Sequence, residues 1–179
     1  MSSTAFPATP IAGASSQEPL GMLYTCHRRV LRRCATLRRL ESYLAACGCD
    51  REAQVVSHGL LRFFDNEVPQ HYADEEEELF PALIESMAGS DAVCLHVLTK
   101  GSAKQHRALD AQWGLLRGPL EEIAAGRQIL LPARSVEAFA GHWHDQIGVE
   151  EGELLAMASR LLTDQELARL NRRMQAHRG

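Results

Sequence analysis

The sequence contains no long hydrophobic run, and this absence limits the classes of protein to which it can belong. No stretch of its 179 residues approaches the ~18 consecutive apolar residues that a membrane-spanning helix needs. The first residues, MSSTAFPATPIAGASSQEP, lack the basic start and the continuous apolar segment of a secretory signal peptide. We therefore expect no membrane partner and predict a cytoplasmic protein.

The sequence also lacks a large net charge and any familiar catalytic motif. The formal net charge is only −4, which gives no general reason to expect binding to nucleic acid. No nucleophilic triad, phosphate-binding loop or dinucleotide fingerprint is found. The cysteines number five, which is odd, and most of them fall inside helical patterns. This favours reduced thiols over a disulfide framework.

Helical periodicity, by contrast, runs through almost the whole chain. Apolar residues recur every three or four positions, and no alternating strand pattern is found. Long helices joined by short loops pack as antiparallel neighbours. The predicted fold is therefore an all-α, up-down-up-down antiparallel four-helix bundle with a short C-terminal helix. The oligomeric state is left open.

The boundaries follow from caps, glycines and prolines. Helices are predicted over 20–46, 50–87, 91–125 and 132–162, and the short terminal helix starts after the Thr163-Asp164 cap. Pro69 and Pro81 lie within the second range, so we expect a break or kink near 66–69 and another near 80. As domains, we predict a disordered leader over 1–19, the bundle over 20–175 and a flexible tail over 176–179.

A short internal repeat links the second and fourth helices. Residues 75–80, EEEELF, resemble residues 150–155, EEGELL. The interval from His27 to His71 equals the interval from His106 to Glu150. The two helix pairs are therefore predicted to be related by an approximate two-fold axis.

Each predicted helix places a His or a Glu among its inward-facing apolar residues. These residues are His27 on the first helix, His71 and Glu75 on the second, His106 on the third and Glu150 on the fourth. Burying an isolated ionised carboxylate is very costly unless it is paired or coordinated. Imidazole and carboxylate are both good metal ligands. The pattern therefore predicts a common metal ion.

Taken singly, these features have ordinary explanations. A lone core histidine such as His27 or His106 is more often packed and hydrogen-bonded than bound to a metal. An acidic run such as residues 74–78 usually forms a solvated helix face. We assign Glu75 alone to the interior, and leave Glu76, Glu77 and Glu78 mostly to solvent. The agreement of four helices favours the metal site.

The spacing also predicts the continuation of each inward stripe beyond its glutamate. On the fourth helix the stripe continues through Leu154, Met157 and Leu161, and on the second through Leu79 and Ala82.

The segment His71-Tyr-Ala-Asp-Glu75-Glu-Glu-Glu-Leu-Phe-Pro81 resembles the signature of the hemerythrin-like (HHE cation-binding) family. The segments around His27, His106 and Glu150 resemble the other helices of that family, so that the resemblance covers roughly residues 20–175. It implies a non-haem iron centre with two irons per chain that binds O2 or NO. In such a centre Glu75 and Glu150 bridge the irons, and His27, His71 and His106 are terminal ligands.

The fourth helix departs from the family pattern. The residue four positions before Glu150 is expected to be His, but it is Gln146. An amide oxygen is a weaker ligand than imidazole, and His142, one turn further back, is a second candidate for the position. His144 points away from this face. With one ligand changed, a single-metal site, or manganese or zinc in place of iron, stays open.

Three functions remain in view. The first is a binding protein that senses or binds O2 or NO, or that handles iron. The second is a di-iron enzyme of oxidative or nitrosative stress defence or of iron–sulfur cluster repair. The third is a metal-free helical interaction module. The sequence favours a metal- and small-ligand-binding protein over an enzyme.

Overall fold

The fold was analysed in a computed structural model that describes residues 18–86 and 91–178. Most of the predicted leader, the link at residues 87–90 and the last residue of the predicted tail lie outside the described residues. Within them the chain is helical and contains no strand, as the periodicity predicts. No helix of this part of the chain is long and apolar enough to cross a membrane.

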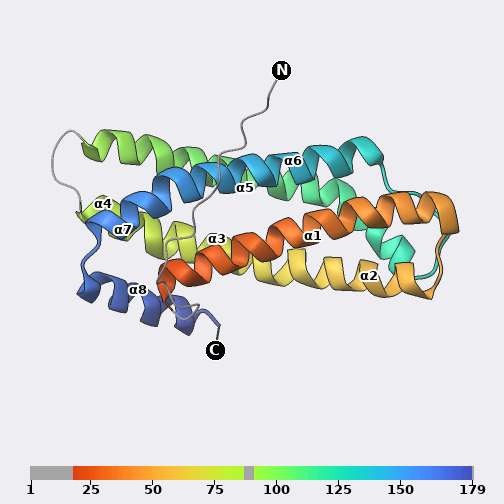
Figure 1. The fold of residues 1–179 in the computed structure, drawn as a ribbon, viewed down its shortest axis with the longest axis horizontal. Coiled ribbons are helices and arrows are strands. Elements are labelled where there is room, and N and C mark those ends of the chain that lie inside the picture. Colours follow the sequence, from red (N-terminus) through yellow and green to blue (C-terminus); the bar gives the residue numbers. More distant parts are fainter. Residues whose placement is uncertain (1–17, 87–90, 179) are drawn as a thin grey trace, which may run out of the picture.

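Four helical arms lie side by side along the long axis of the molecule, and a short helix crosses one end (Figure 1). The second and fourth arms are each continuous helices that contain π-helical turns, labelled η. The elements are α1 (Pro19–Cys47), then α2 (Arg51–Arg62), η1 (Phe63–Glu67), α3 (Val68–Ala73), η2 (Asp74–Leu79) and α4 (Phe80–Ser86), then α5 (Asp91–Ala124), then α6 (Ala133–Val149), η3 (Glu150–Leu155) and α7 (Ala156–Leu161), and finally α8 (Asp164–Ala176).

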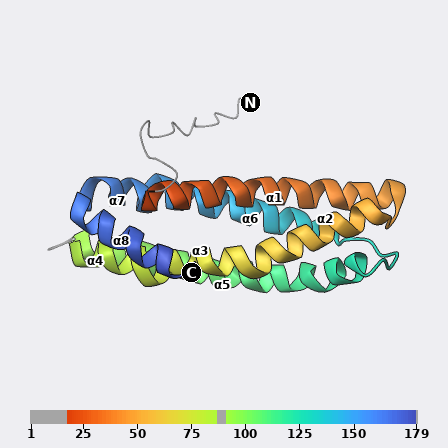
Figure 2. The ribbon, with the colours of Figure 1, turned by 90° about the horizontal axis from the view of Figure 1, so that it is seen from below.

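Consecutive arms run in opposite directions, and Figure 2 shows α1 and α6 in one layer and the second arm and α5 in the other. The closest packing joins α1 to α6, α2 to α5 and α5 to α6. This is the up-down-up-down bundle that the helix lengths and short links predict. The additional helix α8 packs against α1 and η2.

Local signals in the sequence set the helix ends. The Asp50 carboxylate accepts a hydrogen bond from the backbone N–H of Ala53 and caps α2. Thr163 and Glu166 form a reciprocal capping box at the start of α8. Gly126 follows α5 with a φ of 82°, a left-handed conformation that glycine adopts without a steric penalty. These ends agree with the predicted boundaries to within about two residues.

The helix does not break at Pro69 or Pro81. A π-helical turn lies immediately upstream of each, η1 before Pro69 and η2 before Pro81. A proline inside a helix lacks the N–H that would bond back one turn, and its ring collides with the preceding carbonyl. A wider turn accommodates both effects without interrupting the helix. The expected break or kink is therefore a continuous helix with an extra residue in one turn.

The π turns also shift the register of the buried stripe. Beyond η3 the fully buried residues are Ala158 and Leu162, whereas Leu161, predicted to face inward, is 36% exposed. Beyond η2, Leu83 is buried in place of Ala82. Each π turn inserts one residue beyond the regular period, so every later inward position moves by one. The predicted stripe is therefore confirmed at Leu79 and Leu154 and is wrong by one residue beyond them.

The bundle interior contains two apolar clusters. One, built largely from α1, α2, α5 and α6, contains Phe64, Trp113, Phe139 and Trp143. The other, at the end covered by α8, contains Leu83, Leu155 and Met174. The predicted His and Glu residues lie in the bundle interior between them.

Candidate metal centre

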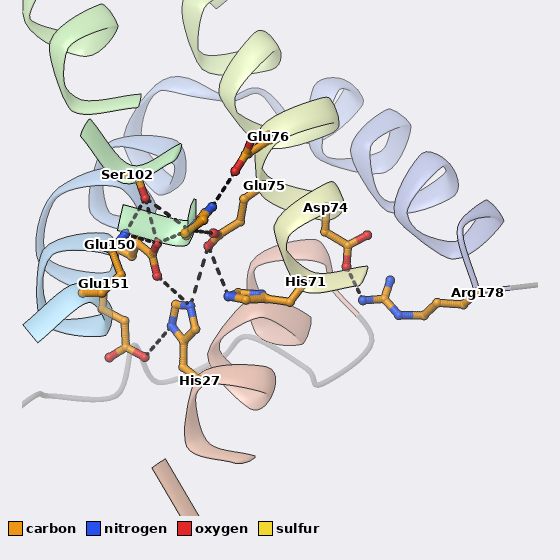
Figure 3. A network of polar contacts seen from close by, with 11 residues as sticks. His27, His71, Asp74, Glu75, Glu76, Ser102, Glu150, Glu151 and Arg178 are labelled. Carbon is orange, nitrogen blue, oxygen red and sulfur yellow. Dashed lines mark hydrogen bonds and ion pairs between the residues drawn. The ribbon is translucent and has the colours of Figure 1, made fainter. Parts of the chain in front are cut away.

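All four arms contribute a buried polar side chain to one place in the bundle. The residues are His27 from α1, His71 from α3 and Glu75 from η2, His106 from α5, and Glu150 from η3; none is more than 1% exposed. Figure 3 shows His27, His71, Glu75 and Glu150 converging from the surrounding helices. The structure thus brings together the five residues that the sequence singled out, and we call them the His/Glu cluster.

Two of the histidines each lie between both carboxylates. His106 Nε2 is 2.9 Å from Glu150 Oε1 and 3.3 Å from Glu75 Oε2. His27 Nε2 is 3.3 Å from Glu150 Oε2 and 3.6 Å from Glu75 Oε1. The Nε2 atoms of both rings and the four carboxylate oxygens therefore border a common space.

The third histidine approaches from the side of Glu75. His71 Nε2 is 3.7 Å from Glu75 Oε1, and its ring meets that of His27 edge to face, with centroids 4.9 Å apart. One donor atom from each of His27, His71, Glu75 and Glu150 lies within 4.8 Å of all the others. A single cation could therefore be reached by donors from α1, α3, η2 and η3.

Several of these atoms have no hydrogen-bond partner in the described part of the chain. They are the Nε2 atoms of His27 and His71, both oxygens of Glu75 and Oε2 of Glu150. Buried polar atoms are hydrogen-bonded in the great majority of proteins, because an unsatisfied one costs about 1–3 kcal/mol. Their donor chemistry, imidazole nitrogen with carboxylate oxygen, fits a divalent transition metal. A bound cation would satisfy all of them at once.

The opposite ring nitrogens are occupied. His106 Nδ1 donates to Glu76 Oε1 at 2.7 Å, and His27 Nδ1 donates to Glu151 Oε1 at 3.0 Å. Such partners hold a ligand histidine in one orientation and keep its other nitrogen directed at the metal. Both acceptors directly follow a cluster glutamate in the sequence, so the repeat supplies one ligand and one orienting carboxylate in each arm.

Comparison with known proteins agrees with this geometry. A profile of the Hemerythrin HHE cation binding domain matches residues 18–158. The chain belongs to the hemerythrin HHE cation-binding family. It is also 30% identical, over 165 residues, to a protein of Haemophilus influenzae that is described only as uncharacterized; the match covers 92% of each chain. The buried His/Glu cluster of this hemerythrin-family domain is compatible with its cation-binding description.

Protonation compensates charge in the metal-free hemerythrin-like site. Burial by itself would lower the pKa of His106, but the carboxylates of Glu150 and Glu75 outweigh burial and raise that pKa to about 10. In the same way the carboxylates of Glu150, Glu151 and Glu75 hold the pKa of His27 well above its ordinary value. Conversely, although burial alone would raise it, the pKa of Glu150 lies well below its ordinary value because His106 bonds to its carboxylate and the His27 ring lies 3.3 Å from it.

Gln146, where the family pattern has a histidine, turns its amide toward Glu150. The side chain is only 4% exposed, and its Nε2 donates to Glu150 Oε1 and, at 2.6 Å, to Ser102 Oγ. Ser102 Oγ in turn donates to Glu150 Oε1 at 2.8 Å. The two neutral side chains therefore satisfy the Glu150 oxygen that faces them by hydrogen bonds.

The structure does not bring His142 to the cluster. Its ring nitrogens contact the side-chain oxygens of Gln105 at 2.9 Å and Gln112 at 3.2 Å. His144 is exposed. Of the two positions considered for the missing fourth-helix histidine, only Gln146 therefore reaches the site.

Sequence reasoning missed the two orienting carboxylates. Glu76 was left mostly to solvent, but its 34% exposed side chain bonds to His106. Glu151, 25% exposed, received no role and bonds to His27. The signal that could have identified them is the repeat itself, because both stand one position after a predicted ligand.

Proposed function

We propose that the His/Glu cluster binds non-haem iron, with two irons per chain, and that the protein binds O2 or NO there. Glu75 and Glu150 would hold the irons through their carboxylates, and His27, His71 and His106 would hold them through their imidazoles. The observation that carries this proposal is the set of buried imidazole and carboxylate atoms without hydrogen-bond partners that face one another inside the bundle. The family match supports a cation as their common partner.

The chain prepares its ligands for a metal before one binds. Glu76 holds the Nδ1 proton of His106 and Glu151 holds that of His27, so each ring would present its Nε2 lone pair to the cluster once a metal displaces the Nε2 proton. The orienting carboxylates also make the imidazoles more basic and hence stronger donors.

Aromatic side chains cover the His106 ring of the cluster. Tyr72 stacks on His106 with ring centroids 4.2 Å apart, and Phe80 lies on the same ring at 6.5 Å. Both are at least 92% buried, since their exposed fractions are 8% and 5%. Iron bound in this setting would supply a redox-active centre at which small molecules such as O2 and NO can bind. The apolar walls restrict access to molecules of that size.

The most direct test combines metal content with the visible spectrum. The full-length protein is purified, loaded with Fe(II) without oxygen, desalted and analysed for metal, and spectra are then recorded after titration with O2 or NO. We expect about two irons per chain and ligand-dependent charge-transfer bands. Less than about a tenth of an iron per chain after loading would overturn the proposal and favour a metal-free interaction module.

A matched pair of histidine variants ties the metal to the cluster. His106→Ala should lose most of the iron, whereas His144→Ala, which removes an exposed histidine outside the cluster, should retain it. Equal iron contents in the two variants would place the metal elsewhere. Manganese or zinc loading of the same proteins shows whether iron is preferred. Catalytic turnover of peroxide or NO by the loaded protein would indicate an enzyme rather than a binding protein.

A further inference from the structure

A cavity opens beside the His/Glu cluster on the side of His71. Its volume is about 360 Å³, and it is lined by Met22, Thr25, Cys26 and Arg29 of α1, by Glu67, Gln70 and His71 of the second arm, and by Arg178 after α8. At about 30 Å³ per water molecule, it has room for roughly ten waters. His71 is the cluster residue that lines it, and both ring nitrogens of His71 are buried without a hydrogen-bond partner among the described residues.

The other side of the cluster is closed. There Gln146 and Ser102 bond to each other and to Glu150. A molecule that approached from that side would have to break these buried hydrogen bonds, whereas the cavity leads to His71 without crossing them. The cavity is therefore the easier route to the metal position.

Arg178, which follows α8, lines this cavity, and the residues after α8 are tied to the ligand-bearing arm by several contacts. Arg178 forms an ion pair with Asp74, which is 0% exposed and directly precedes Glu75 (Figure 3). The Gln70 amide donates to the backbone carbonyl of His177. His177 Nδ1 also lies 3.5 Å from Asp74 Oδ1.

We propose that this cavity is the entrance through which metal ions and small ligands reach the cluster, and that the Arg178–Asp74 ion pair is a latch that holds the end of α8 across it. The ion pair is asymmetric, because Asp74 is fully buried whereas Arg178 is 36% exposed. If the ion pair breaks, Arg178 and the end of α8 can therefore move, while Asp74 and the ligand-bearing arm stay in place. The metal part of this proposal rests on the proposed iron site, but the latch does not.

The entrance suits small molecules that carry little charge. Arg29 at the rim forms an ion pair with Glu67, and Arg178 forms its own with Asp74, so both guanidinium charges are already compensated. O2 and NO are of this class. Divalent ions would be drawn through the same entrance by the negative charge of the cluster carboxylates. Large ligands would have to open the latch further.

Cys26 allows the latch to be tested in the metal-free protein. Its thiol lines the cavity, whereas Cys47 and Cys94 are exposed and serve as internal references. The full-length protein is pulsed with iodoacetamide, and the alkylation of each cysteine is followed by peptide mass spectrometry. We compare Arg178→Gln, which breaks the latch, with Thr25→Phe, which fills the cavity, and with the control Arg172→Gln, an exposed arginine on the same helix.

The two variants are expected to act in opposite directions. Relative to Cys47 and Cys94, Cys26 should be alkylated at least about three-fold faster in Arg178→Gln and at least about three-fold slower in Thr25→Phe, since local opening controls access to part-buried groups. Arg172→Gln should match the wild type. Unchanged Cys26 rates in both variants would overturn the latch, and circular dichroism establishes that each variant is folded.

The rate at which a chelator removes iron tests whether metal ions use the same entrance. After Fe(II) loading without oxygen, the removal of iron by a ferrous-specific chelator should be faster in Arg178→Gln and slower in Thr25→Phe, by similar factors. If both substitutions change the alkylation rate of Cys26 but neither changes the rate of iron removal, the metal takes another path. A wild type that takes up no iron would overturn the proposed function, yet the alkylation rates would still decide the latch.

Discussion

The two arms that carry the glutamates use the same backbone device but make different sites. We call residues 71–76 of the second arm the His71 side and residues 146–151 of the fourth arm the Gln146 side. Each contains a cluster glutamate in or at the start of a π-helical turn, followed by a glutamate that bonds to a histidine of another helix. They differ four residues before the cluster glutamate, where one side has an imidazole and the other an amide.

That single difference changes the whole neighbourhood of each carboxylate. On the Gln146 side the amide and Ser102 occupy Oε1 of Glu150. On the His71 side both oxygens of Glu75 and both ring nitrogens of His71 lack hydrogen-bond partners among the described residues, and a cavity adjoins them. The comparison shows that two arms with similar sequences can differ in how many of their ligand atoms lack a hydrogen-bond partner among the described residues.

Removal of a cluster carboxylate should have the largest effect, on either side. Glu75→Ala and Glu150→Ala are each expected to reduce the iron content after anaerobic loading to below about a tenth of the wild-type value, because each removes one of the two buried carboxylates that face the metal position. Metal analysis measures this, with the exposed Glu77→Ala as the matched control. If one variant kept most of its iron, the two glutamates would not share the metal.

Replacement of His71 by Gln and of Gln146 by His should change iron binding in opposite directions. His71→Gln should weaken iron binding at least about 100-fold, because it replaces an imidazole by an amide on the open side. Gln146→His should increase iron stoichiometry or affinity, since imidazole is the stronger donor. Iron titration monitored by competition with a chelator measures both. If Gln146→His leaves stoichiometry and affinity unchanged, that side does not contact a metal.

Replacement of either orienting carboxylate should weaken iron binding less, and by the same factor on the two sides. Glu76→Gln and Glu151→Gln are each expected to weaken iron binding about 10-fold, because a neutral amide holds the Nδ1 proton of His106 or His27 less firmly. The neighbouring Glu77→Gln should have no effect. Unequal losses, measured in the same chelator competition, would show that the two histidines do not play equivalent roles.

The pH dependence of the metal-free protein should be the smallest of these effects. The pKa of His106 rises from 6.5 to about 10 on folding, so its contribution to stability is complete below pH 6.5 and is lost as the pH rises toward 10. We expect the melting temperature to fall by more than about 5 °C across this interval. His106→Asn should flatten the decrease, as differential scanning calorimetry can show; an equally steep decrease in the variant would assign it to other groups.

Acid should also destabilise the metal-free protein, through a group whose pKa is lowered rather than raised on folding. The pKa of Glu150 is lowered well below 4.5 in the folded protein, so its contribution is present above pH 4.5 and is lost as the pH falls through the folded value. From these groups the metal-free protein should be most stable between about pH 4.5 and 6.5. Bound metal should move this range upward, because it replaces the protons on His27 and His106.

Much of the fold could be predicted from short-range patterns. The apolar period predicts the helices, and the caps at Asp50 and Thr163 predict where two of them begin. The prediction failed where a turn contains one residue more than the regular period. The π turns η1 and η2 each precede a proline, but η3 does not, so the local sequence alone does not give their positions.

The candidate metal site could likewise be predicted in part from the sequence. The residues His27, His71, Glu75, His106 and Glu150 stand out in the sequence because a charged or polar group in an apolar stripe needs a partner. The choice between Gln146 and His142 could not be made from the sequence, since both lie within one turn of the same helix face. The packing of α6 against α5 decides it, because it places His142 beside Gln105 and Gln112.

The sequence by itself determined that four helices with an inward His or Glu would form, because helical period and burial cost act within a few residues of each position. Only the tertiary structure decided which glutamate orients which histidine, that Gln146 bonds to Glu150 on one side of the cluster, and that Arg178 lines a cavity on the other. Those outcomes depend on distances between residues far apart in the chain, and these distances exist only once the helices have packed.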